Sequence, residues 1–274
     1  MSGLSTEQID QYERDGFVFP IDVMSGGEAA ELRARFEKAE HDHPEALHPE
    51  HRNNAHLVFE FLADAAKHPA VVGSVRSIVG DDILLSTSVL FIKEPGTGGF
   101  VSWHQDARYM GLEPHDFVTA WLAISPSNAD TGCMVAIPGS HRDPLRQHVD
   151  TYGEENILTR GQNIDGVDES LAVPFELRPG QMSLHHPRLI HGSAPNIGDD
   201  RRIGLALQSY LPPHVKPGSE DDAMLIAGED RHGHFRRAPH PVGDMSPDAV
   251  EYRAWSNANM SRILYEGADQ VRRL

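Results

Sequence analysis

The feature that most constrains the fold is a change of pattern after Gly80. The segment 83–93 reads ILLSTSVLFIK, a run of strand-forming residues, and further short apolar segments follow it with glycine and proline between them. We predict strands at 83–93, 100–104, 117–124, 134–137, 172–177, 181–185 and 202–211. Strands that follow one another so closely indicate a β-sandwich or barrel.

Helical segments flank this strand-rich middle. Ser5 with Gln8, and Ser25 with Glu28, have the spacing of a capping box at a helix start. We predict helices at about 5–15, 28–40, 57–66, 69–79 and 248–264. The chain therefore reads as a mainly β protein with flanking α-helices.

The sequence contains neither an internal repeat nor a sharp change of composition, so we predict one domain over 1–274. Its parts are N-terminal helices at about 5–79, a strand core at about 80–212, and a C-terminal loop and helix at 213–274. Loops longer than compact domains need are often lids over a site. Two long polar stretches have that length: 141–170 and 212–245.

The charge and cysteine content limit the possible partners and compartments. A net charge of -17 disfavours nucleic acid and anionic membranes, so we expect a small-molecule ligand. The single cysteine, Cys133, cannot form a disulfide within the chain. Without a signal-peptide pattern or an apolar stretch of membrane-spanning length, we expect a cytoplasmic monomer or homodimer.

Two histidines and an aspartate have the spacing of metal ligands. His104 and Asp106 stand at i and i+2 near a predicted strand end, so their side chains point the same way. Taken alone, this pair fits an exposed polar strand end better than a ligand pair. His191, followed by Gly192, comes from a distant strand and adds a second imidazole. Two histidines and one carboxylate would form a facial triad with open coordination positions.

The predicted strand at 202–211 has two different faces. Ile203, Leu205, Leu207 and Leu211 make one face apolar. The opposite face suits a pocket wall and consists of Arg202, Gly204, Ala206, Gln208 and Tyr210. An arginine there could bind a ligand carboxylate bidentately, or it could lie on the surface in a salt bridge.

These motifs, in this order, resemble the phytanoyl-CoA dioxygenase-like family of iron(II)/2-oxoglutarate oxygenases. The similarity extends from about Leu4 to Tyr210. It is carried by Trp103-His104-Gln105-Asp106, Ile137-Pro138-Gly139-Ser140-His141, His186, His191-Gly192-Ser193, Asn196 and Arg202. The resemblance implies a double-stranded β-helix, which is a cupin-like jelly-roll.

The resemblance also implies roles for individual residues. It implies that His104, Asp106 and His191 are the catalytic iron(II) ligands, and that Arg202 and Ser193 bind the distal carboxylate of 2-oxoglutarate. Further residues of the cosubstrate pocket would be Lys93, Thr131 and Trp121. With O2 as the other cosubstrate, the products would be succinate, CO2 and a hydroxylated substrate. Related halogenases have a small residue in place of Asp106, so this carboxylate favours hydroxylation.

We expect the substrate to be a small polar metabolite that could be anionic, of the organophosphonate, amino-acid or natural-product type. Arg108, Tyr109 and Tyr210 are candidates to contact it, and Arg108 would suit an anionic group. Two other functions remain open on the residues alone. One is a non-oxidative cupin-like isomerase or hydrolase that uses zinc on the same triad, and the other is a binding protein that kept the fold without activity.

Overall fold

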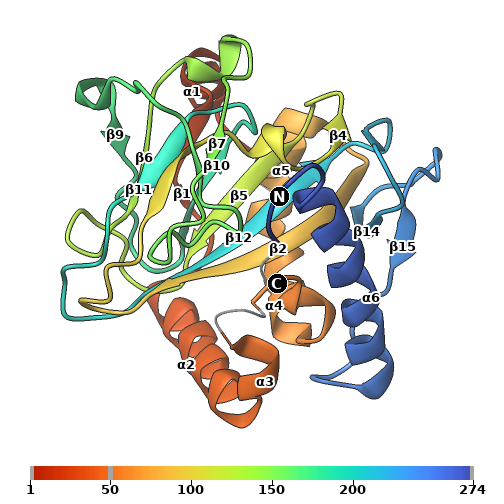
Figure 1. Ribbon diagram of the computed structural model, residues 1–274. Coiled ribbons are helices and arrows are strands. Elements are labelled where there is room, and N and C mark those ends of the chain that lie inside the picture. The colour runs from red at the N-terminus through yellow and green to blue at the C-terminus, as the bar shows by residue number, and fades with distance from the viewer. Residues whose placement is uncertain (1–2, 49–51, 272–274) are drawn as a thin grey trace.

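The computed structural model describes residues 3–48 and 52–271, and its centre is a pair of β-sheets with helices around them (Figure 1). The larger sheet has seven strands in the order β1 (Phe17–Asp22), β10 (Gln181–His185), β5 (Val118–Ala123), β12 (Arg202–Leu211), β2 (Ile83–Lys93), β14 (Asp222–Ala227) and β15 (Arg236–Ala238). The smaller sheet has four strands in the order β3 (Val101–His104), β11 (His191–Ser193), β6 (Met134–Ala136) and β9 (Val173–Pro174). This mainly β, jelly-roll arrangement confirms the predicted fold class.

Several short elements lie outside the two main sheets. They include two separate pairs of strands, β13 (Lys216–Pro217) with β4 (Leu112–Glu113), and β7 (Val149–Asp150) with β8 (Gln162–Asn163). Single 3-10 turns are η1 (Ala55–Leu57), η2 (Asp106–Arg108), η3 (Ser140–Arg142) and η4 (Glu169–Leu171).

The helices match the five predicted ones to within a few residues, except that the short α3 was not predicted. They are α1 (Thr6–Asp15), α2 (Gly26–Asp42), α3 (Pro44–Leu47), α4 (Glu60–Ala66), α5 (Pro69–Val79) and α6 (Pro247–Leu264). Ser5 and Ser25 each form the predicted capping box, and Gly16 ends α1 in the left-handed region at φ 82°. Among the described residues, no helix is both long and apolar enough to cross a membrane.

The two faces of the larger sheet have different neighbours. One face packs against α2, α4 and α5, and Leu122 and Leu205 of the sheet share a buried cluster there with Phe36, Leu62 and Val75. Since side chains alternate along a strand, the neighbouring residues of β5 and β12 point the other way, toward the smaller sheet. Trp121 and Ala206 lie on that second face and belong to a separate cluster. The candidate site lies on this face.

The segment predicted as the loop 212–245 contains β14 and β15, which extend the larger sheet beyond β2. Met224 of β14 pairs with Leu85 of β2. The loop prediction was wrong here because 222–227 is short and polar stretches surround it. Parts of the domain prediction lie outside the described residues, namely 1–2, 49–51 and 272–274.

Candidate metal and cosubstrate site

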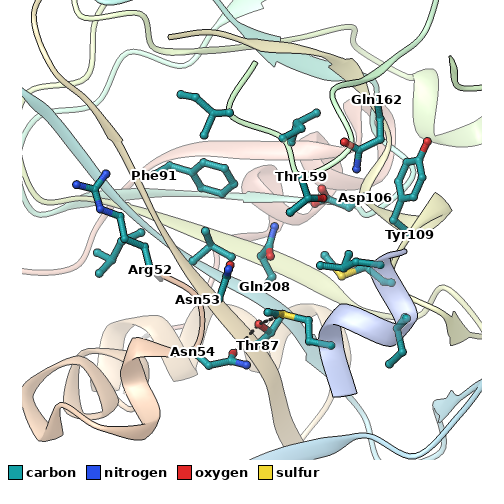
Figure 2. A pocket seen from close by; sticks show the side chains of 18 of the residues that line it. Arg52, Asn53, Asn54, Thr87, Phe91, Asp106, Tyr109, Thr159, Gln162 and Gln208 are labelled. Carbon is teal, nitrogen blue, oxygen red and sulfur yellow. Dashed lines mark hydrogen bonds between the residues drawn. The ribbon is translucent and has the colours of Figure 1, made fainter. Parts of the chain in front are cut away.

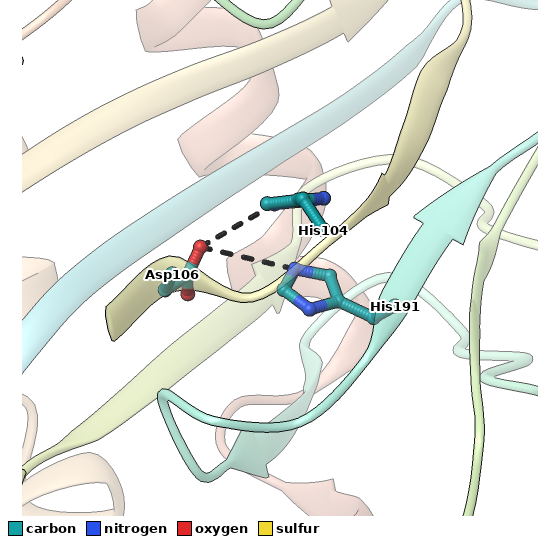
Figure 3. A group of neighbouring side chains, drawn as sticks. All are labelled: His104, Asp106 and His191. Atoms are coloured by element: carbon teal, nitrogen blue, oxygen red, sulfur yellow. Dashed lines mark ion pairs between the residues drawn. The ribbon is translucent and has the colours of Figure 1, made fainter. Parts of the chain in front are cut away.

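The smaller sheet brings three candidate ligands together. His104 ends β3, His191 begins β11, and the two residues are register partners across these antiparallel strands. Asp106 follows in η2. Ligand atoms of the three side chains all lie within 4.8 Å of one another, and Figure 3 shows the carboxylate facing both imidazoles. Asp106 Oδ1 lies 3.4 Å from His104 Nε2 and 3.9 Å from His191 Nε2.

Backbone contacts turn the same nitrogen of each histidine toward the aspartate. Nδ1 of His104 lies 2.9 Å from the carbonyl oxygen of Ser102, and Nδ1 of His191 lies 3.0 Å from that of Leu189. A carbonyl only accepts, so Nδ1 carries the proton and the Nε2 lone pair is free. Burial lowers the pKa of His191 to about 3, which keeps this imidazole neutral, as metal binding requires.

Asp106 is ionised and points away from its sequence neighbour. Burial opposes its ionisation, but the contacts with His104 and His185 outweigh burial and hold the pKa of Asp106 well below its usual value. Gln105 points elsewhere, because its amide nitrogen donates to the Arg188 carbonyl at 2.7 Å. The predicted i, i+2 arrangement therefore brings His104 and Asp106 together, although β3 already ends at His104.

A buried guanidinium lies beyond the three candidate ligands. Arg202 is 2% exposed, and its Nη1 donates to the carbonyl of Gly132 at 2.5 Å, while its Nε has no hydrogen-bond partner in the part of the chain that the structure describes. The guanidinium carbon lies 5.4 Å from the centre of the Trp121 ring. No carboxylate among the described residues forms an ion pair with Arg202. A buried cation without a counter-ion is costly, so this position is suited to a carboxylate supplied by a ligand.

Lys93 and Ser193 lie next to Arg202. Lys93 is the register partner of Arg202 across β2 and β12, and its Nζ donates to Ser193 Oγ at 2.7 Å and to the carbonyl of Ala194. Burial, together with the charge of Arg202, lowers the pKa of Lys93 to about 6. Lys93 therefore orients Ser193 beside the guanidinium.

A cavity of about 40 Å³ connects these groups to the candidate metal ligands. Its lining includes His104, Asp106, His191, Ser193, Arg202, Trp121, Thr119 and Gln208. Thr131 does not line it, because its hydroxyl accepts from the backbone of Asn128 at 2.9 Å and closes a turn beside Gly132. The role of Thr131 toward the cosubstrate has no direct contact to support it.

A second cavity, of about 600 Å³, opens on the other side of His104 and Asp106 (Figure 2). Its walls are β2, the adjoining residues 52–54, the segment 154–162 and the last turns of α6. Tyr109 lines it, as predicted for a substrate-contacting residue, whereas the side chain of Arg108 is exposed and is not part of the lining. The stretch 154–162 belongs to the first of the two predicted lid segments.

Tyr210 does not face this cavity, so the strict alternation predicted for its strand was wrong at that point. Ser209 has φ 61°, and the register of β12 against β5 shifts between Leu207 and Tyr210. The extra residue of this bulge turns Tyr210 to the helix side, where its hydroxyl donates to the Ala66 carbonyl at 2.7 Å. Leu211 moves to the other face for the same reason and joins a different cluster.

Two residues without a predicted role contact Asp106. Nε2 of His185 lies 3.5 Å, and Oγ1 of Thr119 3.4 Å, from Asp106 Oδ2. His185 and Thr119 are register partners across β10 and β5. The sequence carried a weak signal for them, since each is a polar residue within a predicted buried strand.

Comparison with known proteins places these motifs in a family. The model of the family described as phytanoyl-CoA dioxygenase (PhyH) matches residues 12–204. A probable alpha-ketoglutarate-dependent hypophosphite dioxygenase of Stutzerimonas stutzeri is 29% identical over 165 residues, 58% of this chain and 57% of that protein. The peroxisomal phytanoyl-CoA dioxygenase of Rattus norvegicus is 26% identical over 217 residues, 70% of this chain and 64% of that protein. The chain spans about half the length of the curated relatives that it matches.

Solved structures give the same result over a larger part of the chain. The non-heme monooxygenase ThoJ, in its apo form, has a TM-score of 0.84 at 29% identity and covers 94% of this chain and 97% of its own. CytC3 has a TM-score of 0.68 at 25% identity, covering 89% of this chain and 97% of its own. The resemblance inferred from the sequence motifs is thereby confirmed, and the chain belongs to the phytanoyl-CoA dioxygenase family.

Proposed function

We propose that the protein is an iron(II)- and 2-oxoglutarate-dependent dioxygenase that hydroxylates a small molecule, with O2 as the other cosubstrate and succinate and CO2 as further products. The observation that carries this proposal is the buried guanidinium of Arg202, which has no carboxylate partner within 3–48 and 52–271 and lies across a narrow cavity from His104, Asp106 and His191. A dicarboxylic keto acid can contact the metal with one end and Arg202 with the other.

The donor set fits the proposed metal. Two neutral imidazoles and one carboxylate on one side are typical of non-heme iron(II) oxygenases, and the other coordination positions stay open. Iron(II), when bound with 2-oxoglutarate and O2, would supply the oxidising chemistry. Asp106 provides the third protein ligand, which favours hydroxylation over halogenation.

The protein's own residues bind and orient the cosubstrate and the substrate. Arg202 and Ser193 orient the distal carboxylate of the cosubstrate, and Lys93 holds Ser193 in place. Trp121 lies beside the guanidinium and helps to exclude water from it. The substrate would bind in the 600 Å³ cavity, whose lining includes His104 and Asp106. The cytoplasmic location and the monomeric or homodimeric state stay predictions.

The metal and cosubstrate can be tested without knowing the substrate. Anaerobic protein loaded with iron(II) should develop a weak visible charge-transfer band when 2-oxoglutarate is added. In air with ascorbate, the same protein should form succinate, and a matching small molecule should increase the rate. A protein that binds zinc tightly and gives neither the band nor succinate would instead be a non-oxidative metal enzyme.

A further inference from the structure

The 600 Å³ cavity extends well beyond the candidate metal ligands. On β2 its lining runs from Ile92 to Ser86, a span of about 20 Å at roughly 3.3 Å per residue. The cavity has the volume of sites for drug-sized ligands, which is typically 300–1,000 Å³. A molecule as small as hypophosphite would leave most of it unfilled. The groups along its length therefore indicate the class of substrate.

The cavity offers little positive charge to an anionic substrate. Arg52 is the only lysine or arginine among the described residues that line it. Its guanidinium donates to Glu40 Oε1 and to the carbonyl of Leu47, both at 3.2 Å, and points away from Gln208 in Figure 2. A phosphonate or carboxylate group would have to compete with Glu40 for this cation.

The end of the cavity near Ser86 carries negative charge instead. Asp221 lines it there, and its carboxylate accepts hydrogen bonds from the backbone N–H of Asp222, at 2.9 Å, and from the side chain of Ser86. No lysine, arginine or histidine among the described residues forms an ion pair with Asp221. Burial and the neighbouring charge of Asp222 together raise the pKa of Asp221 to about 7, against the opposing effect of the hydrogen bonds from the Asp222 backbone and from Ser86. A cation bound next to this carboxylate would offset both the cost of burying its charge and the repulsion from Asp222.

The walls between Asp221 and the metal ligands are largely apolar. Phe91 of β2 and Met260 and Ile263 of α6 line this part, and Tyr109 adds an aromatic ring. Gln208 lies between them and lines both cavities. Such walls suit a hydrocarbon or aromatic body rather than a uniformly polar one.

We propose that the substrate carries a positively charged nitrogen, that Asp221 binds this group, and that the apolar body of the substrate extends along Phe91 and Met260 to the metal site. This inference rests on the proposed function and narrows its substrate class from polar metabolites in general to amphipathic amines. The net charge of -17 supports it, since an acidic protein attracts cations from solution.

The test uses the iron-loaded protein with 2-oxoglutarate, without oxygen, at pH 8, where Asp221 is ionised. The probes are phenylalkylamines with two to six methylene groups, together with the alcohols and carboxylates of the same lengths. Binding is measured by calorimetry and by the change in the charge-transfer band. The best amine should bind at least tenfold more tightly than its matched alcohol, and carboxylates should bind more weakly than the alcohols.

Variants assign the effect to one side chain. Asp221→Asn should remove the tenfold preference for the amine while leaving the charge-transfer band intact and the melting temperature at least as high as that of the wild type. Glu154→Gln is the matched control, because Glu154 also lines the cavity but is exposed, and it should change the affinity for amines less than twofold. If Asp221→Asn does not fold, Asp221→Ser replaces it.

Two results would overturn the inference. One is that carboxylates bind as tightly as amines, or that no amine binds at all. The other is that the preference for amines survives in the Asp221 variant. Failure of the proposed function looks different, because no charge-transfer band would form with 2-oxoglutarate. In that case the calorimetric comparison of amines with alcohols still decides whether Asp221 recognises a cation.

Discussion

Nε2 of His185 lies 3.5 Å from Oδ2 of Asp106, the oxygen that does not face His104 and His191. Oγ1 of Thr119 approaches the same Oδ2 to 3.4 Å. The side chain of His185 is buried, at 2% exposure, beside this carboxylate. Two side chains from the larger sheet therefore hold one carboxylate oxygen and leave Oδ1 for a metal ion.

His185→Phe should weaken metal binding about tenfold, since loss of a contact that orients a ligand typically costs 10–100-fold in affinity. His185→Gln should recover much of the loss, because an amide can still donate to Oδ2. Cobalt(II) titration followed by its visible absorption measures affinity and ligand geometry independently of turnover. His186→Gln is the control, since Nδ1 of His186 accepts from the backbone of Arg188 instead. Equal affinity in His185→Phe and wild type would contradict the positioning role.

Arg202→Leu should raise the dissociation constant for 2-oxoglutarate by about 100-fold, the effect expected from losing charge-assisted hydrogen bonds worth roughly 3 kcal/mol. Its sequence neighbour supplies a matched control. Arg201 forms ion pairs with Glu40 and Glu94 on the opposite side of the strand, so Arg201→Leu should leave cosubstrate affinity unchanged. Anaerobic titration followed by the charge-transfer band gives the dissociation constant of 2-oxoglutarate for each variant. Equal losses in the two variants would mean that Arg202 has no specific role.

Tyr210→Phe should lower stability without changing substrate binding. The variant leaves the carbonyl of Ala66 without its donor, which costs about 1 kcal/mol and lowers Tm by about 2–4 °C. Tyr109→Phe should change substrate binding and leave Tm unaltered, because Tyr109 lines the large cavity. Thermal melts and KM values for an identified substrate separate the two effects. A changed KM with unchanged Tm in Tyr210→Phe would restore the role first inferred from strand alternation.

The strand positions and the metal-binding motif could be predicted because each depends on local pattern. The ranges predicted for β2, β10 and β12 agree with the structure, since continuous apolar runs bounded by turn residues are a strong strand signal. The pairing of His104 with His191 could be inferred only from family resemblance, because it depends on which strands are neighbours. Spacing along the chain does not determine that order.

Two features of the site could not be predicted from pattern. The bulge at Ser209 reverses the direction of Tyr210, and one residue with positive φ has no clear signature when it is a serine. The contact between His185 and Asp106 depends on how the two sheets pack against each other. The position of Asp221 at the end of the cavity likewise depends on how distant parts of the chain pack around it.

Asp221→Asn should stabilise the protein at high pH and not at low pH. An aspartate in the unfolded chain ionises near pH 4, whereas burial raises the pKa of Asp221 in the folded state to about 7. The folded state therefore holds this proton more tightly and loses stability as the pH rises from about 4 to about 7. Asn avoids that loss.

We expect Tm of Asp221→Asn to exceed that of wild type by about 2–4 °C at pH 8 and to equal it at pH 4, if the difference is about 1 kcal/mol. Differential scanning calorimetry at pH 4 and pH 8 measures the difference in Tm. Asp222, whose pKa burial raises to about 6, is present in both proteins, so the cost of its own burial is common to both. A gain in Tm of the same size at both pH values would contradict burial as the cause.

Gly204→Ala should damage the cosubstrate site through Trp121. A Cβ at position 204 would lie 1.9 Å from Cζ2 of Trp121, so the indole has to move from its place beside Arg202. We expect about tenfold weaker binding of 2-oxoglutarate and a loss of roughly 1–3 kcal/mol in stability from overpacking. Gly27→Ala in α2 is the control, because nothing but Ser25 Oγ lies within 4 Å of its new Cβ.

A double variant shows whether the clash acts through the indole. Trp121→Leu alone should weaken 2-oxoglutarate binding modestly, since the guanidinium loses its aromatic neighbour. If the indole carries the effect of Gly204→Ala, adding that change to Trp121→Leu should cost little more, and the two variants should be strongly non-additive. Additive losses would mean that the new methyl group acts on β12 itself, and the need for glycine at 204 would then come from the strand rather than from the cosubstrate site.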